Sequence, residues 1–131
     1  MTFAYLATPY TNYPHGRGNA IIVAARLVER LIRAGHVVYS PICHSHAAAA
    51  YGVGPEIAQA QWLALDEPLM RAASRLLVAH LDGWDKSAGI AHEVMFFGEY
   101  LGKPIFDLDP GTLEMVERKR DDYKTAAQNV V

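Results

Sequence analysis

Residues 76–93 read LLVAHLDGWDKSAGIAHE, and this stretch carries the pattern that decides the fold. The run from Leu76 to Leu81 is apolar and of strand length, and the residues that follow it up to Lys86 are typical of a turn. Ser87 is suited to be the N-cap of a helix that runs to Leu101, with an apolar stripe of Ile90, Val94, Phe97 and Leu101. The stretch therefore predicts a buried strand, a turn and an amphipathic helix.

The same alternation extends in both directions from this stretch. Thr8-Pro9 stops an apolar run, Gly35 stands where a helix C-cap is wanted, and Pro41 ends another short run. We expect strands at 3–7, 36–40, 76–81 and 103–108, and helices from 19 to about 34, over 57–73, over 87–101 and, as a polar final helix, from about 112 to 127.

Two segments are less regular. The alanine-rich stretch 42–54 is predicted to be a loop with some helical content, because glycines stand at its end. Pro68 would clash inside the helix expected over 57–73, so we expect that helix to break and to restart with Asp66 or Glu67 near a new N-cap.

Strands that alternate with helices at this spacing indicate a mostly parallel sheet with helices on both faces. We therefore expect a single-domain α/β fold over 1–131, a Rossmann-like or flavodoxin-like three-layer sandwich whose short sheet has the order 2-1-3-4. In such sheets ligands bind outside the carboxyl ends of the strands. The segments to examine are 8–12, 40–46 and 82–87, with the first turns of the helices that follow them.

Composition narrows the class of partner. The 131 residues are 51% hydrophobic and 20% charged, which suits one globular domain with a real core. A formal net charge of −2 provides no broad basic field, so we expect neither a nucleic-acid partner nor a membrane partner. Cys43 is the only cysteine, the apolar runs are too short to span a bilayer, and the first residues lack the pattern of a signal peptide. A cytoplasmic protein is expected.

Two acids are candidates for chemistry. Glu93 lies about two turns into its predicted helix and next to the apolar position Val94, so it would be close both to the ligand edge and to the core. An acid so placed has a raised pKa unless donors hold it, and such acids often serve as catalysts. A solvated helix glutamate is the alternative for Glu93, and simple helix capping is the alternative for Asp66.

Other polar residues are candidates for binding. The Tyr5 hydroxyl needs a partner if its strand is buried, and a neighbouring acid would provide one, although a core tyrosine looks the same. Ser87 opens a helix whose free N–H groups could hold a phosphate, although a plain N-cap looks the same. From the loops and first turns at the expected ligand edge, the candidate substrate-binding residues are Thr8, Tyr10, Asp85, Ser87 and Gly89.

Metal and cofactor motifs are sparse. His44 and His46, beside Cys43, raise the question of zinc, but no second cluster with ligand spacing follows. His80 and His92 are interpreted as packing or surface residues. The sequence contains neither Gly-x-Gly-x-x-Gly after the first strand nor a P-loop, so we expect no metal and no cofactor.

Four segments together resemble the nucleoside 2-deoxyribosyltransferase family and its nucleotide N-hydrolase relatives. They are Tyr5-Leu6-Ala7-Thr8-Pro9-Tyr10, Asp66, the stretch from Asp82 to Glu93, and Gly102-Lys103-Pro104-Ile105. The resemblance runs from Tyr5 to about Phe106. Its most specific parts are the serine, glycine and glutamate of the third segment and the Gly-Lys-Pro of the fourth.

The resemblance implies roles for individual residues. Glu93 matches the nucleophile that attacks the anomeric carbon, Tyr5 the tyrosine that orients it, and Asp66 the aspartate that contacts the base and helps to protonate it. Ser87 stands where the transferases have a sugar-binding aspartate and the monophosphate hydrolases have a serine. The aromatic C-terminal tail of the transferases has no clear equivalent after Leu108, which favours a hydrolase.

The sequence therefore predicts an enzyme that hydrolyses or transfers the N-glycosidic bond of a nucleoside or nucleotide, assembled as a homodimer or larger. The alternatives are a non-catalytic nucleotide sensor that uses the same pocket and a metal hydrolase built on His44 and His46. The catalytic prediction requires Tyr5, Asp66, Ser87 and Glu93 to converge around one pocket.

Overall fold

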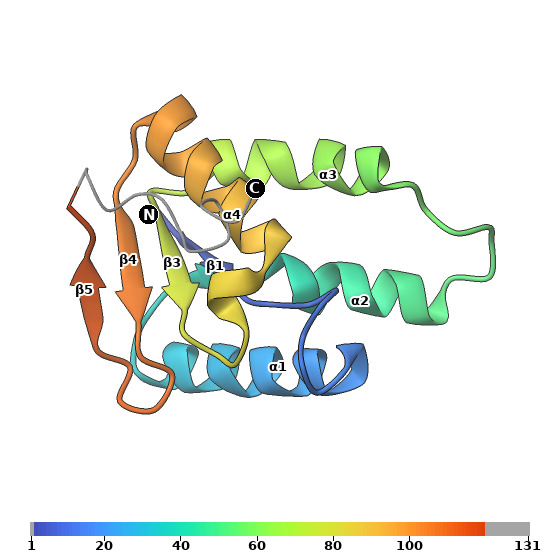
Figure 1. The fold of residues 1–131 in the computed structure, drawn as a ribbon, viewed down its shortest axis with the longest axis horizontal. Helices are drawn as coiled ribbons and strands as arrows, with labels where there is room; N and C mark the ends of the chain where they lie inside the picture. Colours follow the sequence, from blue (N-terminus) through green and yellow to red (C-terminus); the bar gives the residue numbers. More distant parts are fainter. Residues whose placement is uncertain (1, 120–131) are drawn as a thin grey trace.

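The computed structural model describes residues 2–119, in which a five-stranded sheet has helices on both faces (Figure 1). The strand order is β2-β1-β3-β4-β5. Strand β1 pairs in parallel with β2 and β3, β3 pairs in parallel with β4, and only β5 is antiparallel. The strands are β1 (Ala4–Ala7), β2 (Val38–Tyr39), β3 (Arg75–Ala79), β4 (Ile105–Leu108) and β5 (Met115–Glu117). The predicted three-layer α/β class and the order 2-1-3-4 are confirmed.

Two apolar clusters hold the layers together. Helix α1 (Arg17–Arg33) packs Leu27 and Leu31 against Leu6 and Leu77 on one face of the sheet. Helix α3 (Gln59–Ala72) and helix α4 (Ala88–Met95) with the π-helical segment η2 (Phe96–Leu101) cover the other face. The buried face of α1 runs through Ala20, Ala24, Leu27 and Leu31, whereas Ile32 is 57% exposed.

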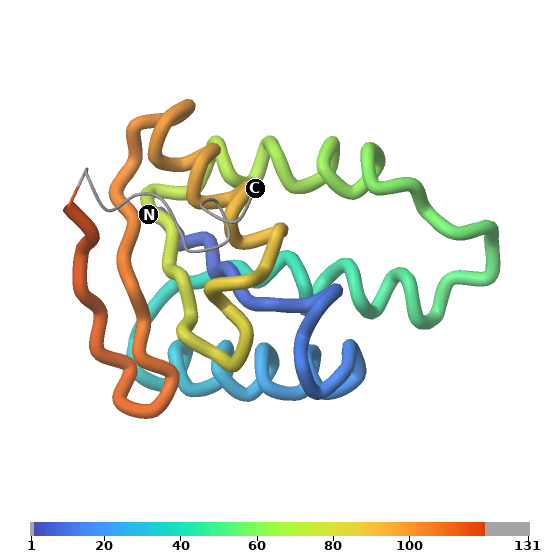
Figure 2. Tube along the Cα trace, in the orientation of Figure 1, coloured from blue at the N-terminus to red at the C-terminus, as the bar shows by residue number. Residues whose placement is uncertain are grey.

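The stretch 42–54, predicted to be a loop with some helical content, is mostly a helix, α2 (Pro41–Tyr51), so the prediction of a loop was wrong for 42–51. Ser40 is its N-cap, and its Oγ accepts a hydrogen bond from the Cys43 N–H at 3.2 Å. Pro41 takes the first helical position, where its missing N–H costs nothing, and the alanines that follow are strong helix formers. The chain between α2 and α3 forms the far end of the molecule (Figure 2).

The predicted break at Pro68 does not occur. Helix α3 is continuous through the proline, so Asp66 lies in the helix interior and caps nothing. The proline removes one hydrogen bond to the carbonyl four residues earlier, but its ring is on the exposed side. Met70, two residues further on, is buried in the core, and its packing stabilises the helix beyond the proline.

The polar final helix expected from about 112 to 127 is also wrong where the structure describes it. After β4 the chain turns at Asp109, whose Oδ1 accepts the N–H groups of Gly111 at 2.7 Å and Thr112 at 3.1 Å. It then returns as β5 beside β4. The rest of that predicted helix, 120–127, lies outside the described residues. In the part of the chain that the structure describes, no helix has both the length and the apolarity to cross a bilayer.

Candidate active site

A cavity of about 1060 Å³ opens beyond the carboxyl end of β1, beside α2, α3 and the start of α4, the helix that follows β3. This is the point of the sheet where strand order reverses, at which ligands bind in doubly wound folds. Among the described residues that line it are seven of the eight predicted site residues: Tyr5, Thr8, Tyr10, Asp66, Ser87, Gly89 and Glu93. The expected convergence is confirmed, and the roles stay predictions. Asp85 lies in the short 3-10 turn η1 (Trp84–Lys86) and is not among the lining residues.

Glu93 reaches the cavity from the core side of α4. Its neighbour Val94 is fully buried, while Glu93 keeps part of its surface on the cavity. Burial raises the pKa of the Glu93 carboxyl well above its ordinary value, the nearby charge of Asp66 raises it further, and a hydrogen bond with the Tyr5 hydroxyl lowers it. Tyr5 is itself buried within β1, and burial raises the pKa of its hydroxyl, so it acts as a hydrogen-bond donor.

Asp66 faces the same space from α3. Its Oδ1 is buried and has no hydrogen-bond partner among residues 2–119. Burial raises the pKa of this carboxyl, and the proximity of His44 partly opposes that shift. A buried carboxyl oxygen without a partner is unusual in a folded protein, and here it lines an open cavity.

Thr8 supplies a second polar atom of the same kind. It follows β1 directly, is only 5% exposed, and its Oγ1 finds no partner within the described chain. An unsatisfied buried hydroxyl costs roughly 1–3 kcal/mol unless something else bonds to it. Thr8 and Asp66 therefore place two hydrogen-bonding atoms on the cavity wall where a polar ligand would satisfy both.

The N-terminus of α4 forms another part of the wall. The Ser87 Oγ caps the helix by accepting the Ile90 N–H at 3.2 Å, and its own proton is still free to be donated. Ala88 and Gly89 line the cavity in the first turn. Arg17, the first residue of α1, also lines the cavity, so a guanidinium and a positive helix end face the same space.

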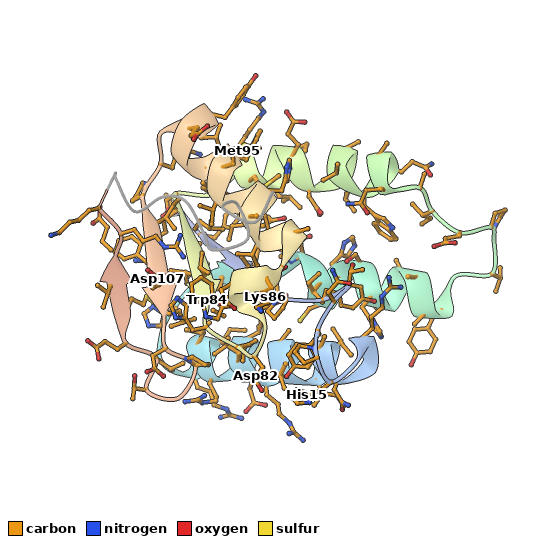
Figure 3. All side chains as sticks on the ribbon, viewed as in Figure 1. His15, Asp82, Trp84, Lys86, Met95 and Asp107 are labelled. Atoms are coloured by element: carbon orange, nitrogen blue, oxygen red, sulfur yellow. The ribbon has the colours of Figure 1, made fainter. Side chains whose placement is uncertain are left out.

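Contacts between loops hold the rim of the cavity. The Tyr10 hydroxyl and His46 Nδ1 are 2.7 Å apart, and the Arg17 guanidinium lies over the Tyr10 ring at 5.5 Å from its centre. On the outer side, His15 Nε2 is 2.9 Å from Asp82 Oδ2; both residues are labelled in Figure 3. These contacts join the loop after β1 to α2 and to the loop after β3.

Several lining residues were not predicted from the sequence as part of the site, among them Arg17, Trp62 and His92. His92 was interpreted as packing or surface, yet it lines the cavity and also stacks on Phe96. Trp62 lies four residues before Asp66 in α3, so helical spacing puts both on one face. That spacing was a usable signal, but the expected break at Pro68 hid it.

The histidines of α2 do not build a metal centre with their neighbours. His46 is engaged with Tyr10, and His44 is exposed. Among residues 2–119 no group of three or more histidine, cysteine, aspartate or glutamate side chains is placed to hold a metal ion. The hypothesis of a metal hydrolase therefore lacks a ligand set in the described structure.

Comparison with protein families matches residues 2–109 to a family described as a domain of unknown function, DUF1937. The chain belongs to this family. The match covers the sheet from β1 to β4 and every residue that lines the cavity. A search of curated proteins finds no match. The description of DUF1937 names no activity.

Proposed function

We propose that the protein hydrolyses the N-glycosidic bond of a nucleoside 5′-monophosphate. The observation that carries this proposal is the pairing of two unlike acids in one cavity. Glu93 has a tyrosine hydroxyl as partner, whereas Asp66 presents a buried oxygen without one. Cleavage of a glycosidic bond uses two carboxyl groups in different roles, one toward the sugar and one toward the leaving group.

The reaction divides into two balanced steps. In the first, a Glu93 carboxylate oxygen bonds to C1′ while the C1′–N bond breaks, and the base nitrogen takes the bonding electrons and the proton of Asp66. In the second, a water oxygen bonds to C1′, Glu93 leaves as a carboxylate, and Asp66 takes the proton that water loses. The sum is nucleotide plus water giving free base plus sugar phosphate.

The raised pKa values support a pair of acids that retains one proton, and the hydrogen bond with Tyr5 favours the carboxylate form of Glu93. Burial acts on both acids, and the charge of Asp66 also raises the pKa of Glu93. Because two anions in one poorly solvated space repel each other, the pair retains one proton to higher pH than ordinary carboxyls would. That shared proton is what the departing base requires.

Hydrolysis of a monophosphate is favoured over transfer between nucleosides. The Ser87 hydroxyl, the first turn of α4 and Arg17 give the cavity donors for a phosphate. A serine at this position is also what the resemblance associates with the hydrolases. We further propose that the protein works in the cytoplasm, as a homodimer or larger assembly, on small molecules and not on nucleic acid or membranes.

A base-release assay tests the proposal. Purified protein would be incubated with a mixed pool of nucleosides and nucleoside 5′-monophosphates, and free bases would be separated by chromatography. We expect bases to appear from monophosphates first. Saturable binding of a monophosphate without any base release would identify a sensor that uses the same pocket and would overturn the enzymatic proposal.

A further inference from the structure

The cavity extends well beyond the reacting cluster. Its inner part holds Tyr5, Asp66 and Glu93, while its outer part is lined by α2, by α3 and by the chain that connects them. Its volume of about 1060 Å³ stands at the upper limit of the roughly 300–1,000 Å³ typical of pockets for drug-sized ligands. A single nucleoside monophosphate therefore leaves part of the space unfilled.

Helix α3 sets the direction of this extra space. Met70, Asp66, Trp62 and Gln59 follow one another along the face of α3 that lines the cavity, and Met70 is in the core. From Asp66 to Gln59 the helix advances about 10 Å, at 1.5 Å per residue. Trp62 therefore lies next to Asp66 on the outward side, where a base held by Asp66 would continue.

The outer part is apolar and has few charges. Ala48 and Ala49 of α2, Ile57 of the connection, and Trp62 and Leu63 of α3 all contribute to its walls. The small alanine side chains leave room, and the half-buried Trp62 offers a flat surface. Glu56 is the only charged residue from 48–63 that lines the cavity, and it disfavours an anionic ligand there.

We propose that this outer part receives an apolar substituent carried by the base, so that the preferred substrate is a nucleotide with an extended, uncharged group on its base. The inference builds on the proposed function, because it places the base at Asp66. The substituent continues from the base along α3, stacks on Trp62 and fills the space beside Ala48 and Ala49. It replaces water on apolar walls, which favours binding of the larger leaving group.

Matched substrate pairs test this inference. 2′-Deoxyadenosine 5′-monophosphate would be compared with its N6-benzyl derivative, and 2′-deoxycytidine 5′-monophosphate with its N4-benzyl derivative. We expect a benzyl compound to have a kcat/KM at least tenfold above that of its parent, chiefly through a lower KM. Trp62→Ala should lower kcat/KM for the benzyl compound at least tenfold more than for its parent, and Trp62→Phe should restore most of the difference.

The control is Tyr51→Ala, since Tyr51 is an aromatic residue of α2 that is 86% exposed and does not line the cavity. This substitution should leave kcat/KM unchanged for both the benzyl compound and its parent. Parents that are cleaved while both benzyl compounds are rejected, or cleaved no better, would overturn the inference and leave the proposed function standing. If nothing is cleaved, calorimetry decides: tighter binding of a benzyl compound that depends on Trp62 would support the substituent site and end the hydrolase proposal, whereas no difference would end both.

A second copy of the chain is the rival occupant of the outer part. Acrylamide quenching of tryptophan fluorescence, with Trp84→Phe to leave Trp62 as the reporter, would detect it. We expect quenching that does not depend on protein concentration and that falls when the benzyl nucleotide is added. Shielding of Trp62 that increases with protein concentration in the absence of ligand would overturn the inference.

Discussion

In the proposed mechanism the Glu93 carboxyl group has to be ionised to attack the sugar, yet burial and the charge of Asp66 both raise its pKa. The hydrogen bond with Tyr5 acts in the opposite direction and selects the carboxylate. A positive charge that develops at C1′ during base departure would favour that carboxylate further. The surroundings of Glu93 therefore favour its ionised form through a hydrogen bond rather than through water, as the proposed role of nucleophile requires.

Replacing Glu93 with glutamine should abolish base release and preserve the fold and ligand binding. The amide keeps the size of the side chain and can still bond to Tyr5, but it cannot form the glycosyl ester. We expect a loss of turnover of at least about 10⁴-fold, the scale seen when a nucleophile is removed. Rates of base release and calorimetry with the same monophosphate would measure the two effects.

The matched control for this variant is Glu99→Gln, because Glu99 is exposed on η2 and does not line the cavity. Its rate should equal that of the wild type. Trapping with a fluorinated sugar nucleotide should add one sugar phosphate to Glu93 in a peptide mass map. Mass on Asp66 would show that the two acids have exchanged roles, and wild-type turnover by Glu93→Gln would reject the mechanism.

Asp66→Asn should make the protein more stable at neutral and basic pH. Burial raises the pKa of Asp66 in the folded chain above its ordinary value of 3.8, so the folded state retains the proton longer than the unfolded state. Stability is therefore fully present below that value and is lost as the pH rises through the folded pKa. We expect the free energy of unfolding to increase by about 0.5–2 kcal/mol at pH 8, the usual range for single stabilising substitutions, and to change very little near pH 3.5.

Urea unfolding at the two pH values would measure this difference, with activity assayed in parallel. The variant should lose base release while it gains stability, which separates a functional acid from a structural one. A variant that is less stable than the wild type at pH 8 would mean that the Asp66 carboxylate holds the fold together.

The place of Ser87 and Glu93 could be predicted because the carboxyl ends of parallel strands and the helices that follow them meet at one edge of the sheet. Asp66 lies in α3, which leads into β3, and only the family resemblance implied its place in the site. Trp62 could not be placed with them. A helix that breaks near Pro68 gives no fixed relation between the side chains of Trp62 and Asp66. Because α3 is continuous, Trp62 lies one turn before Asp66 on the same face of the helix. The unpartnered atoms of Thr8 and Asp66 likewise depend on packing that no local pattern records.

At the scale of elements, the least predictable feature is the return of the chain as β5. The Arg118 side chain, only 5% exposed, donates hydrogen bonds from Nε to both oxygens of the Asp107 carboxylate of β4 and from Nη2 to one of them. His80 Nε2 lies 2.6 Å from the same carboxylate, and its ring stacks on Trp84 at 3.9 Å. Figure 3 labels Asp107 and Trp84 in this cluster. A polar tail with helical propensity thus becomes a strand through contacts distant in sequence.

Asp107→Asn should therefore destabilise the protein by about 1–3 kcal/mol, because it leaves the buried guanidinium of Arg118 without its counter-charge. Burial would raise the pKa of Asp107, but hydrogen bonds from Arg118 and His80 outweigh it and lower that pKa. The stability from this cluster is present above the ordinary value of 3.8 and is lost as the pH falls through the folded pKa. Denaturant titrations monitored by Trp84 fluorescence would measure both the loss and its pH dependence.

Glu29→Gln provides the comparison for Asp107→Asn. Glu29 also pairs with an arginine, Arg33 at 2.9 Å, but both side chains are exposed. Its removal should change stability by no more than about 0.5 kcal/mol. Equal effects of the two substitutions would show that β5 is held by its backbone bonds alone.

The sequence of helix α2 contains residues that favour a helix, although a loop was predicted for most of it. Ser40, Pro41 and the alanines at 47–50 are a good N-cap, a good first residue and good helix formers. The glycines beyond Tyr51 end this helix and do not make the whole segment a loop. The regular strands and α4 were predictable because their apolar patterns are local. The continuity of α3 depends on tertiary packing, and the turn after β4 depends on the Asx turn at Asp109.

For the whole molecule, the net charge is negative, whereas the groups that line part of the cavity are positive or are hydrogen-bond donors. The chain carries a formal charge of −2, so long-range forces do not attract an anion. The cavity nevertheless collects Arg17, the Ser87 hydroxyl and the N-terminus of α4. Selection for a phosphate therefore has to act at contact distance, through charge-assisted hydrogen bonds of roughly 1.5–3 kcal/mol each.

A 5′-monophosphate should therefore bind at least tenfold more tightly than its nucleoside, as measured by calorimetry on Glu93→Gln to prevent turnover. Raising the NaCl concentration from 0.1 to 1 M shortens the screening length from about 10 Å to about 3 Å. It should therefore weaken the binding of the monophosphate and leave that of the nucleoside unchanged. Arg17→Gln and Ser87→Ala should each reduce the preference, whereas Arg26→Gln, an exposed change on α1 away from the cavity, should not. Equal affinity for nucleotide and nucleoside, unaffected by salt, would show that the phosphate is not recognised and would favour a transferase acting on nucleosides.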